Sequence, residues 1–218
     1  MFFTKRKILY FPGCLTSAAL PNIVLNYKKL FEKFKIKVTE LNRKACCGAV
    51  AYNNGYLKDF EEIKGRFQEI LKINGAREIV TNDPQCLHTL LHHYGRKTIH
   101  VSELISKYKN KLPVMYDEEA TYYDSPRLKI YDEPREILKA LGFEMIELEK
   151  NRENSILCGA EGGMIQNTPA LARKIAKEVF NTCKTKKLIV SDPLTYYHLK
   201  KHTPVNIQVL ELSEVFEI

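Results

Sequence analysis

The chain of 218 residues repeats itself, and this internal repeat is the feature that most constrains its fold. Four landmarks of the first half return in the same order, the first three of them at offsets of 112, 111 and 109 residues, which indicates a duplicated unit. The matched segments are ILYFPGCLT with ATYYDSPRL, ACCGAV with LCGAEG, EIVTNDPQCLHTLLHHY with KLIVSDPLTYYHLKKH, and IHVSELI with IQVLELSEVF. We therefore predict two tandem units, residues 1–110 and 111–218, with a linker near 109–120.

Each unit alternates strand-like and helix-like segments. The first has β-rich runs at 7–11, 37–41 and 77–82, and helical apolar spacing at 19–34, 55–75 and 86–95. The second repeats the order, with a helix that closes by 143, strands at 145–149 and 187–193, and a helix over 168–184 capped by Thr168. Strands that alternate with helices indicate parallel sheets with right-handed crossovers. We expect an α/β fold of two tandem, pseudo-twofold-related Rossmann-like units.

The net charge of +8 does not by itself indicate nucleic-acid binding. Lysine and glutamate are mixed along the predicted helices, which is typical of solvated faces, and an anionic substrate or an acidic partner suits the same charge. No apolar run approaches the roughly 20 residues that a membrane span needs. The N-terminus also lacks the pattern of a secretory signal. We therefore expect a cytoplasmic protein with no membrane span and no nucleic-acid partner.

Four of the six cysteines follow predicted strands. Cys14 comes after the first strand, Cys46 and Cys47 after the second, and Cys86 after the third, in a C-x31-C-C-x38-C spacing. The carboxyl ends of parallel strands meet at one edge of a sheet, so the four thiols are expected to converge. A reducing compartment disfavours a disulfide framework. Metal binding or redox chemistry is then the leading interpretation.

The adjacent Cys46 and Cys47 favour an iron–sulfur cluster over zinc. Zinc sites usually take cysteines in C-x2-4-C pairs, and neighbouring cysteines cannot easily chelate a single zinc ion. A cluster offers several irons at different corners, although plain buried thiols are a third interpretation. Nearby residues suit a cluster because they can shape the turns, offset its charge or receive an anionic substrate. These residues are Pro12, Gly13, Arg43, Lys44, Gly48, Pro84 and His88.

The segments YFPGC, ACCGAV, NDPQC and YDEPREILKALGFEMIELEKNRENSILCGAEGGM resemble the cysteine-rich CCG domain family over nearly the whole chain. That family includes a subunit of heterodisulfide reductase and the iron–sulfur subunits of anaerobic glycerol-3-phosphate dehydrogenase and of lactate utilisation. The resemblance implies two CCG units, each able to hold a [4Fe-4S] cluster of cubane or noncubane form, within a larger redox complex. It assigns Cys14, Cys46, Cys47 and Cys86 as the ligands of the first unit.

The chain also departs from the family pattern. The noncubane form uses a further cysteine in a C-x-x-C ending, but Thr89 stands three residues after Cys86, which favours an ordinary four-thiolate cluster. In the second unit, cysteines of the family are replaced by Pro126, by Leu157, and by Thr195 or a neighbour. Only Cys158 remains there, so we expect no second cluster.

The two cysteines outside the predicted ligand set have less defined roles. Cys158 is either a leftover buried thiol or an extra ligand or redox thiol near the first site. Cys183 lies in the lysine-rich helix end NTCKTKK, where nothing besides the nearby lysines marks it as reactive. We treat Cys183 as incidental.

Two functions fit these features. The first is an iron–sulfur redox subunit of a heterodisulfide reductase-like complex, which reduces or forms a disulfide or relays electrons. The chain has no G-x-G-x-x-G fingerprint, so its electrons would come from a flavin or iron–sulfur centre on another subunit. The second is a non-catalytic assembly or binding subunit with a structural cluster or zinc. The sequence identifies no catalytic residue.

Overall fold

The computed structural model describes residues 7–41 and 45–217. The chain divides into two compact units, Met1–Val101 and Ser102–Glu217. Each unit contains one four-stranded sheet in which all the paired strands run parallel. The predicted α/β class with parallel sheets is therefore confirmed, whereas the pseudo-twofold relation between the units stays a prediction.

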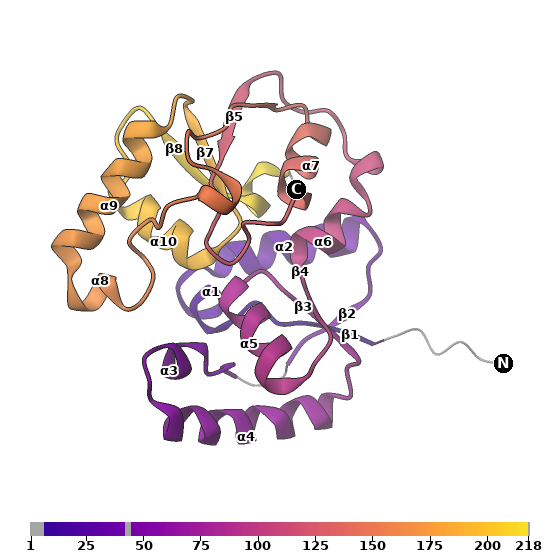
Figure 1. Ribbon diagram of the computed structural model, residues 1–218. Coiled ribbons are helices and arrows are strands. Elements are labelled where there is room, and N and C mark those ends of the chain that lie inside the picture. Colours follow the sequence, from indigo (N-terminus) through magenta and orange to yellow (C-terminus); the bar gives the residue numbers. More distant parts are fainter. Residues whose placement is uncertain (1–6, 42–44, 218) are drawn as a thin grey trace. The chain divides into compact units, whose positions relative to one another are not determined.

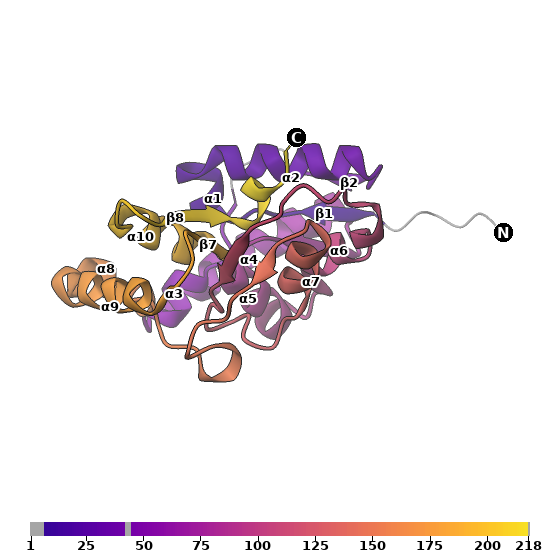
Figure 2. The same cartoon turned by 90° about the horizontal axis from the view of Figure 1, so that it is seen from above.

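The first unit has its strands in the order β2-β1-β3-β4. The views show α2 on one side of these strands and α4 on the other (Figures 1 and 2). The strands are β1 (Ile8–Tyr10), β2 (Val38–Thr39), β3 (Glu78–Thr81) and β4 (Thr98–His100). The helices are α1 (Cys14–Ala19), α2 (Pro21–Lys33), α3 (Ala49–Asn53), α4 (Leu57–Asn74) and α5 (Pro84–Tyr94).

The second unit has the equivalent strand order β6-β5-β7-β8. Its helices α7 and α9 lie on opposite sides of the strands (Figure 1). The strands are β5 (Glu119–Tyr122), β6 (Glu144–Met145), β7 (Lys187–Val190) and β8 (Gln208–Glu211). The helices are α7 (Glu133–Ala140), α8 (Met164–Asn167), α9 (Pro169–Thr182) and α10 (Pro193–His202), while α6 (Val101–Ser106) begins at the unit boundary. Short 3-10 turns occupy Lys109–Lys111, Arg152–Asn154 and Leu212–Val215.

The two sheets share their central register as well as their strand order. In the first unit Leu9 of β1 pairs with Ile79 of β3. Thr121 of β5 pairs in the same way with Leu188 of β7. These residues correspond at the offsets of 112 and 109 that the sequence repeat predicts. The repeat is thus a structural duplication of one sheet with its register.

Several element ends follow the predicted stop signals. The helix α4 ends at Asn74, and Gly75 takes the left-handed conformation that closes it (φ 70°). The helix α5 ends in the same way at Gly95 (φ 57°). Thr168 occupies the N-cap position of α9 as predicted, but its side chain makes no cap hydrogen bond to that helix. Its hydroxyl instead donates to the Met164 carbonyl of α8 at 3.5 Å.

Other predicted boundaries were wrong for local reasons. The single helix expected over 19–34 is broken at Leu20 (φ −133°), because the residue before a proline is disfavoured in the helical region and Pro21 begins a new helix. The strand expected at 145–149 is reduced to Glu144–Met145, since the chain then leaves the sheet and Glu147 bonds Arg135. The strands β4 and β8 were not predicted.

Candidate metal centre

Four cysteine side chains lie together in the first unit. Cys14 is the first residue of α1, Cys46 and Cys47 precede α3, and Cys86 lies in the first turn of α5. The Cys14 and Cys46 sulfurs are 3.8 Å apart, and the Cys47 and Cys86 sulfurs are 3.0 Å apart. The structure therefore brings together all four thiols that the sequence proposed as ligands. Their ligand role itself stays a prediction.

The four sulfurs differ in their exposure to solvent. Cys47 and Cys86 are each 2% exposed and belong to the hydrophobic core of the unit, together with Phe67 and Leu90. Cys46 is partly buried and Cys14 is exposed. The group of thiols thus has one side anchored in the core and one side open to solvent.

Hydrogen bonds among the four thiols give them very different pKa values. Hydrogen bonds from Cys14 and then from Cys47 lower the pKa of Cys46 to about 2. The bond to Cys46 raises the pKa of Cys47 well above its usual value, and the pKa of Cys14 is also raised, first by its bond to Cys46. For Cys86, the bond with Cys47 lowers the pKa, but burial and the charge of Asp83 outweigh it and raise the pKa to about 11. Full ionisation of the group therefore needs a bound cation, whose binding releases protons.

Two glycines allow the ligand turns to come close. Gly13 has φ 83°, and a Cβ there would lie 3.0 Å from a carboxylate oxygen of Asp83 and 3.2 Å from the Cys86 sulfur. Gly48 has φ 80°, and its Cβ would lie 2.8 Å from the Phe60 ring. The Gly48 amide also donates to the Cys46 sulfur at 3.4 Å. A side chain at either glycine would be strained by the positive φ and would meet these neighbours.

Two further residues, which the sequence did not single out for the site, hold its backbone. The Asp83 carboxylate accepts hydrogen bonds from the amides of Gln85 and Cys86 at 2.8 and 3.1 Å, and so caps α5. The Tyr94 hydroxyl donates to the Cys47 carbonyl at 2.9 Å. The Asp-Pro pair before a helical run is the sequence signal that could have identified the cap.

Removal of the Asp83 cap tests this arrangement, with Asp192 of the second unit as its matched control. Asp192 caps α10 through the amides of Leu194 and Thr195. Asp83→Ala and Asp192→Ala are each expected to lower the free energy of unfolding by about 1 kcal/mol, measured in urea. Only Asp83→Ala should speed the reaction of Cys86 with a thiol reagent, because it releases that turn and removes a charge that raises the Cys86 pKa. Equal thiol reactivity in the two variants would contradict the positioning role.

The other residues named by the sequence fall in different places. Arg43 and Lys44 lie outside the described residues. Pro84 is the first residue of α5, and His88 is exposed on the same helix. Residues 1–101 contain 17 of the 34 Lys and Arg but only 8 of the 26 Asp and Glu. The positive charge of the chain therefore resides in the unit that carries the four thiols.

A cavity of about 830 Å³ opens beside Cys14. Its volume lies within the range of small-molecule sites, which are mostly apolar with a few polar groups. Glu40 is the only charged side chain among its described lining residues, and it pairs with Lys28 at 2.7 Å. The lining residues are Tyr10, Phe11, Pro12, Cys14, Ser17, Ala18, Pro21, Val24, Leu25, Glu40, Leu41 and Ala45.

The second unit keeps two of the three turns that carry the thiols, but only one of the four thiols. Thr195 takes the place of Cys86, since its amide bonds the capping Asp192 and its hydroxyl lies 3.9 Å from the Cys158 sulfur. Cys158 is fully buried, and burial raises the pKa of its thiol. Leu157 is 45% exposed at the position of Cys46. One thiol therefore remains where the first unit has four.

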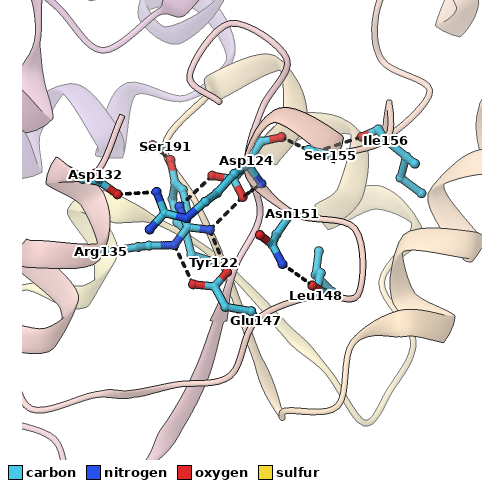
Figure 3. Close-up of polar contacts among 11 residues, drawn as sticks. Tyr122, Asp124, Asp132, Arg135, Glu147, Leu148, Asn151, Ser155, Ile156 and Ser191 are labelled. Atoms are coloured by element: carbon cyan, nitrogen blue, oxygen red, sulfur yellow. Dashed lines mark hydrogen bonds and ion pairs between the residues drawn. The ribbon is translucent and has the colours of Figure 1, made fainter. Parts of the chain in front are cut away.

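The remaining turn of the second unit is built on ion pairs (Figure 3). Both oxygens of Asp124 accept from Arg135 at 2.7 Å, and Arg135 also makes two bonds of 2.7 Å to Glu147. Asp124 further accepts from the backbone amide of Arg152 at 2.7 Å. The first unit has α1 at the equivalent place, and the second has no helix between β5 and α7.

Other metal-binding groups were sought in the part of the chain that the structure describes. Cys183 is the C-cap residue that follows α9, and its thiol lies 3.6 Å from the Thr185 carbonyl. Within residues 7–41 and 45–217, no set of three or more His, Cys, Asp or Glu side chains is arranged to hold a single metal ion.

A family model described as a cysteine-rich domain, CCG, matches residues 8–91 and 121–200. The two matches coincide with the two copies of the repeat. The chain belongs to the CCG family. The resemblance seen in the cysteine segments is thus confirmed.

Several curated relatives match this chain at modest identity. An uncharacterized iron-sulfur protein of Methanocaldococcus jannaschii is 27% identical over 90% of this chain and 41% of its own length. A subunit of the dihydromethanophenazine:CoB–CoM heterodisulfide reductase of Methanosarcina acetivorans is 25% identical over 79% of this chain and 47% of its own. A probable iron-sulfur-binding oxidoreductase of Bacillus subtilis, FadF, is 30% identical over 62% of this chain and 20% of its own length. The chain thus matches less than half of the length of each of these relatives.

No helix of the CCG protein, within its described residues, has the length and apolar character needed to cross a membrane.

Proposed function

We propose that this CCG protein is an iron–sulfur redox subunit that holds one [4Fe-4S] cluster through Cys14, Cys46, Cys47 and Cys86. The proposal rests on four thiols gathered where three parallel strands end, two in the core and two toward solvent. The bound cluster would supply one-electron transfer. The chain would supply the four thiolates and the glycine turns that admit backbone amides, in a unit with an excess of basic residues.

The thiol arrangement fits a cluster better than a single metal ion. A tetrahedral zinc ion needs four ligands around one point at about 2.3 Å from sulfur. The adjacent Cys46 and Cys47 bond each other, and each also contacts a further thiol of its own, Cys14 for Cys46 and Cys86 for Cys47. Neighbouring cysteines that reach separate partners suit a centre with several metal corners. Thr89 is buried at the position of the further cysteine of the noncubane form, which supports an ordinary four-thiolate cluster.

The open side of the site supports exchange with a small thiol or disulfide. Cys14 is exposed and lines the apolar cavity, so a small molecule in that cavity would lie against the Cys14 corner of the cluster. Reduction of a disulfide would consume two electrons and two protons and release two thiols. The electrons would arrive singly through the cluster from a partner subunit, because the chain has no nucleotide fingerprint of its own.

The charge distribution and the relatives support a redox partner. The excess of basic residues in the first unit favours an acidic surface on the donor, which would speed association at low salt. One relative is named as part of a heterodisulfide reductase, and another as an EtfAB:quinone oxidoreductase from Syntrophomonas wolfei. We place the chain in a complex of this general kind, with a flavin or iron–sulfur donor.

Anaerobic purification tests the proposal. We expect broad visible absorbance, about four iron and four acid-labile sulfide per chain, and an EPR signal on reduction by one electron. Addition of an aliphatic disulfide should reoxidise the reduced centre. A colourless protein with one zinc per chain would contradict the cluster and favour a structural role. A cluster that cannot be reduced or reoxidised would also favour the structural role.

A further inference from the structure

The exposed face of α5 carries two histidines one helical turn apart. His88 and His92 are four residues apart, a spacing that places them on the same face of the helix. Their ring centroids are 4.2 Å apart, with the ring planes inclined by 44°. Two imidazoles at this spacing are how helical metal sites present nitrogen ligands. We propose that His88 and His92 chelate a divalent transition-metal ion of the Ni²⁺, Cu²⁺ or Zn²⁺ class.

The helix holds this pair in place before any metal arrives. Asp83 caps its first turn, and the opposite face of α5 buries Leu87, Leu90 and Tyr94 in the core. The spacing of the two imidazoles is therefore fixed by a packed helix, so little backbone freedom is lost on binding. Imidazole nitrogen suits nickel, copper and zinc, whereas calcium and magnesium require oxygen ligands.

The other neighbouring histidines of the described chain are used for packing. His93 lies against the rings of Tyr52 and Phe60, with centroids 4.1 and 5.2 Å away. His198 and His202 on α10 have the same four-residue spacing, with centroids 4.9 Å apart. However, His198 is only 2% exposed and its ring nitrogen bonds the Ala172 carbonyl at 3.2 Å. This second pair cannot present both imidazoles to a dissolved ion, so it provides a matched control.

His88 already makes an interaction within the protein. A histidine ligand uses one ring nitrogen, and the other commonly donates to a protein acceptor that orients the ring. Water would complete the coordination of a two-histidine site. The ion would bridge two turns of the helix that begins beside Cys86, and so would stiffen the element that carries this thiol. The histidine site does not depend on the proposed cluster.

Nickel ion is the probe for the test. The purified protein, anaerobic and at pH 8, is dialysed against Ni²⁺, and the bound nickel is counted for the wild type and three variants. Loss of a residue that only hydrogen-bonds a metal ligand already costs 10–100-fold in metal affinity. His88 and His92 would be ligands themselves, so His88→Ala and His92→Ala should each weaken nickel binding by at least about tenfold. His202→Ala should bind like the wild type. All three positions are outside the core, so folding should be preserved.

Two further readouts separate the outcomes. Nickel should slow hydrogen exchange of the α5 amides in the wild type and not in His92→Ala, since only a chelated ion bridges the two turns. Nickel held by cysteine thiols would instead give strong sulfur-to-metal absorbance that both histidine variants retain. Equal nickel binding in the wild type and the His88 and His92 variants, or no slowing of exchange in α5, would overturn the proposal. Neither result would bear on whether the protein holds a cluster.

Discussion

Cys47→Ser is expected to remove the proposed iron–sulfur centre, whereas Cys158→Ser is expected to leave iron and sulfide content unchanged. Both cysteines are buried and hold equivalent positions in the duplicated units. They differ in their neighbours, because Cys47 contacts the Cys86 thiol and Cys158 contacts the Thr195 hydroxyl. Serine is close in size to cysteine but a poor ligand for iron, so the comparison isolates the loss of a thiolate.

Iron and sulfide analysis with visible absorbance measures this result. The expected iron content falls from about four per chain to near zero for Cys47→Ser, because three thiolates in an open site hold a [4Fe-4S] cluster weakly. Urea unfolding of both variants would show whether the loss is local. Full iron content in Cys47→Ser would remove Cys47 from the ligand set. Loss of iron in Cys158→Ser would mean that the second unit contributes a ligand.

Arg135→Ala is expected to lower the free energy of unfolding of the second unit by about 3–5 kcal/mol. The Arg135 side chain is 3% exposed and Asp124 is fully buried, so the variant leaves a buried carboxylate without its partner. Removing one member of a buried pair costs this much because the remaining charge loses its compensation. Glu147 contributes less, since its side chain is 36% exposed and water screens it. The expected loss is a large part of the stability of an ordinary domain.

Arg152→Ala provides the matched control for Arg135→Ala. The Arg152 guanidinium pairs with Asp132 at 2.5 Å, but both side chains are exposed, at 47% and 61%. Its backbone amide, which donates to Asp124, is retained in the variant. We therefore expect a change within about 1 kcal/mol, measured by urea unfolding followed by circular dichroism. A similar small loss in Arg135→Ala would mean that the protein relaxes to hydrate Asp124.

Much of the fold could be predicted because the sequence contains two copies of the same unit. The repeat indicated the two parallel sheets, and Gly75 and Gly95 marked two helix ends correctly. The break at Leu20 was missed because helical periodicity continues through it, although Pro21 signalled it. The strand β6 was predicted too long, because Glu147 leaves the sheet to pair with Arg135. Hydrophobic periodicity cannot reveal such a pairing.

The thiols of the candidate site could be predicted from the sequence, but the residues that hold the thiol-bearing turns in place could not. Because the carboxyl ends of parallel strands meet at one edge of a sheet, the sequence predicted that Cys14, Cys46, Cys47 and Cys86 converge. The same rule says nothing of side-chain depth, so the contrast between buried Cys86 and exposed Cys14 had to come from the structure. Asp124 lies in a segment that the sequence marked only as part of the repeat, and Arg135 in one that it marked only for its family resemblance, so their ion pair is a tertiary property.

The unequal depth of the four sulfurs has a consequence for oxidative damage. Oxygen or peroxide that reaches the site from solvent meets Cys14 and then Cys46 before the two sulfurs in the core. Susceptibility to oxidation follows exposure and thiolate character, so injury should begin at this corner. Cys47 and Cys86 would be the last to oxidise, because Phe67 and Leu90 pack around them. A damaged site would thus retain two reduced thiols in the core of the unit.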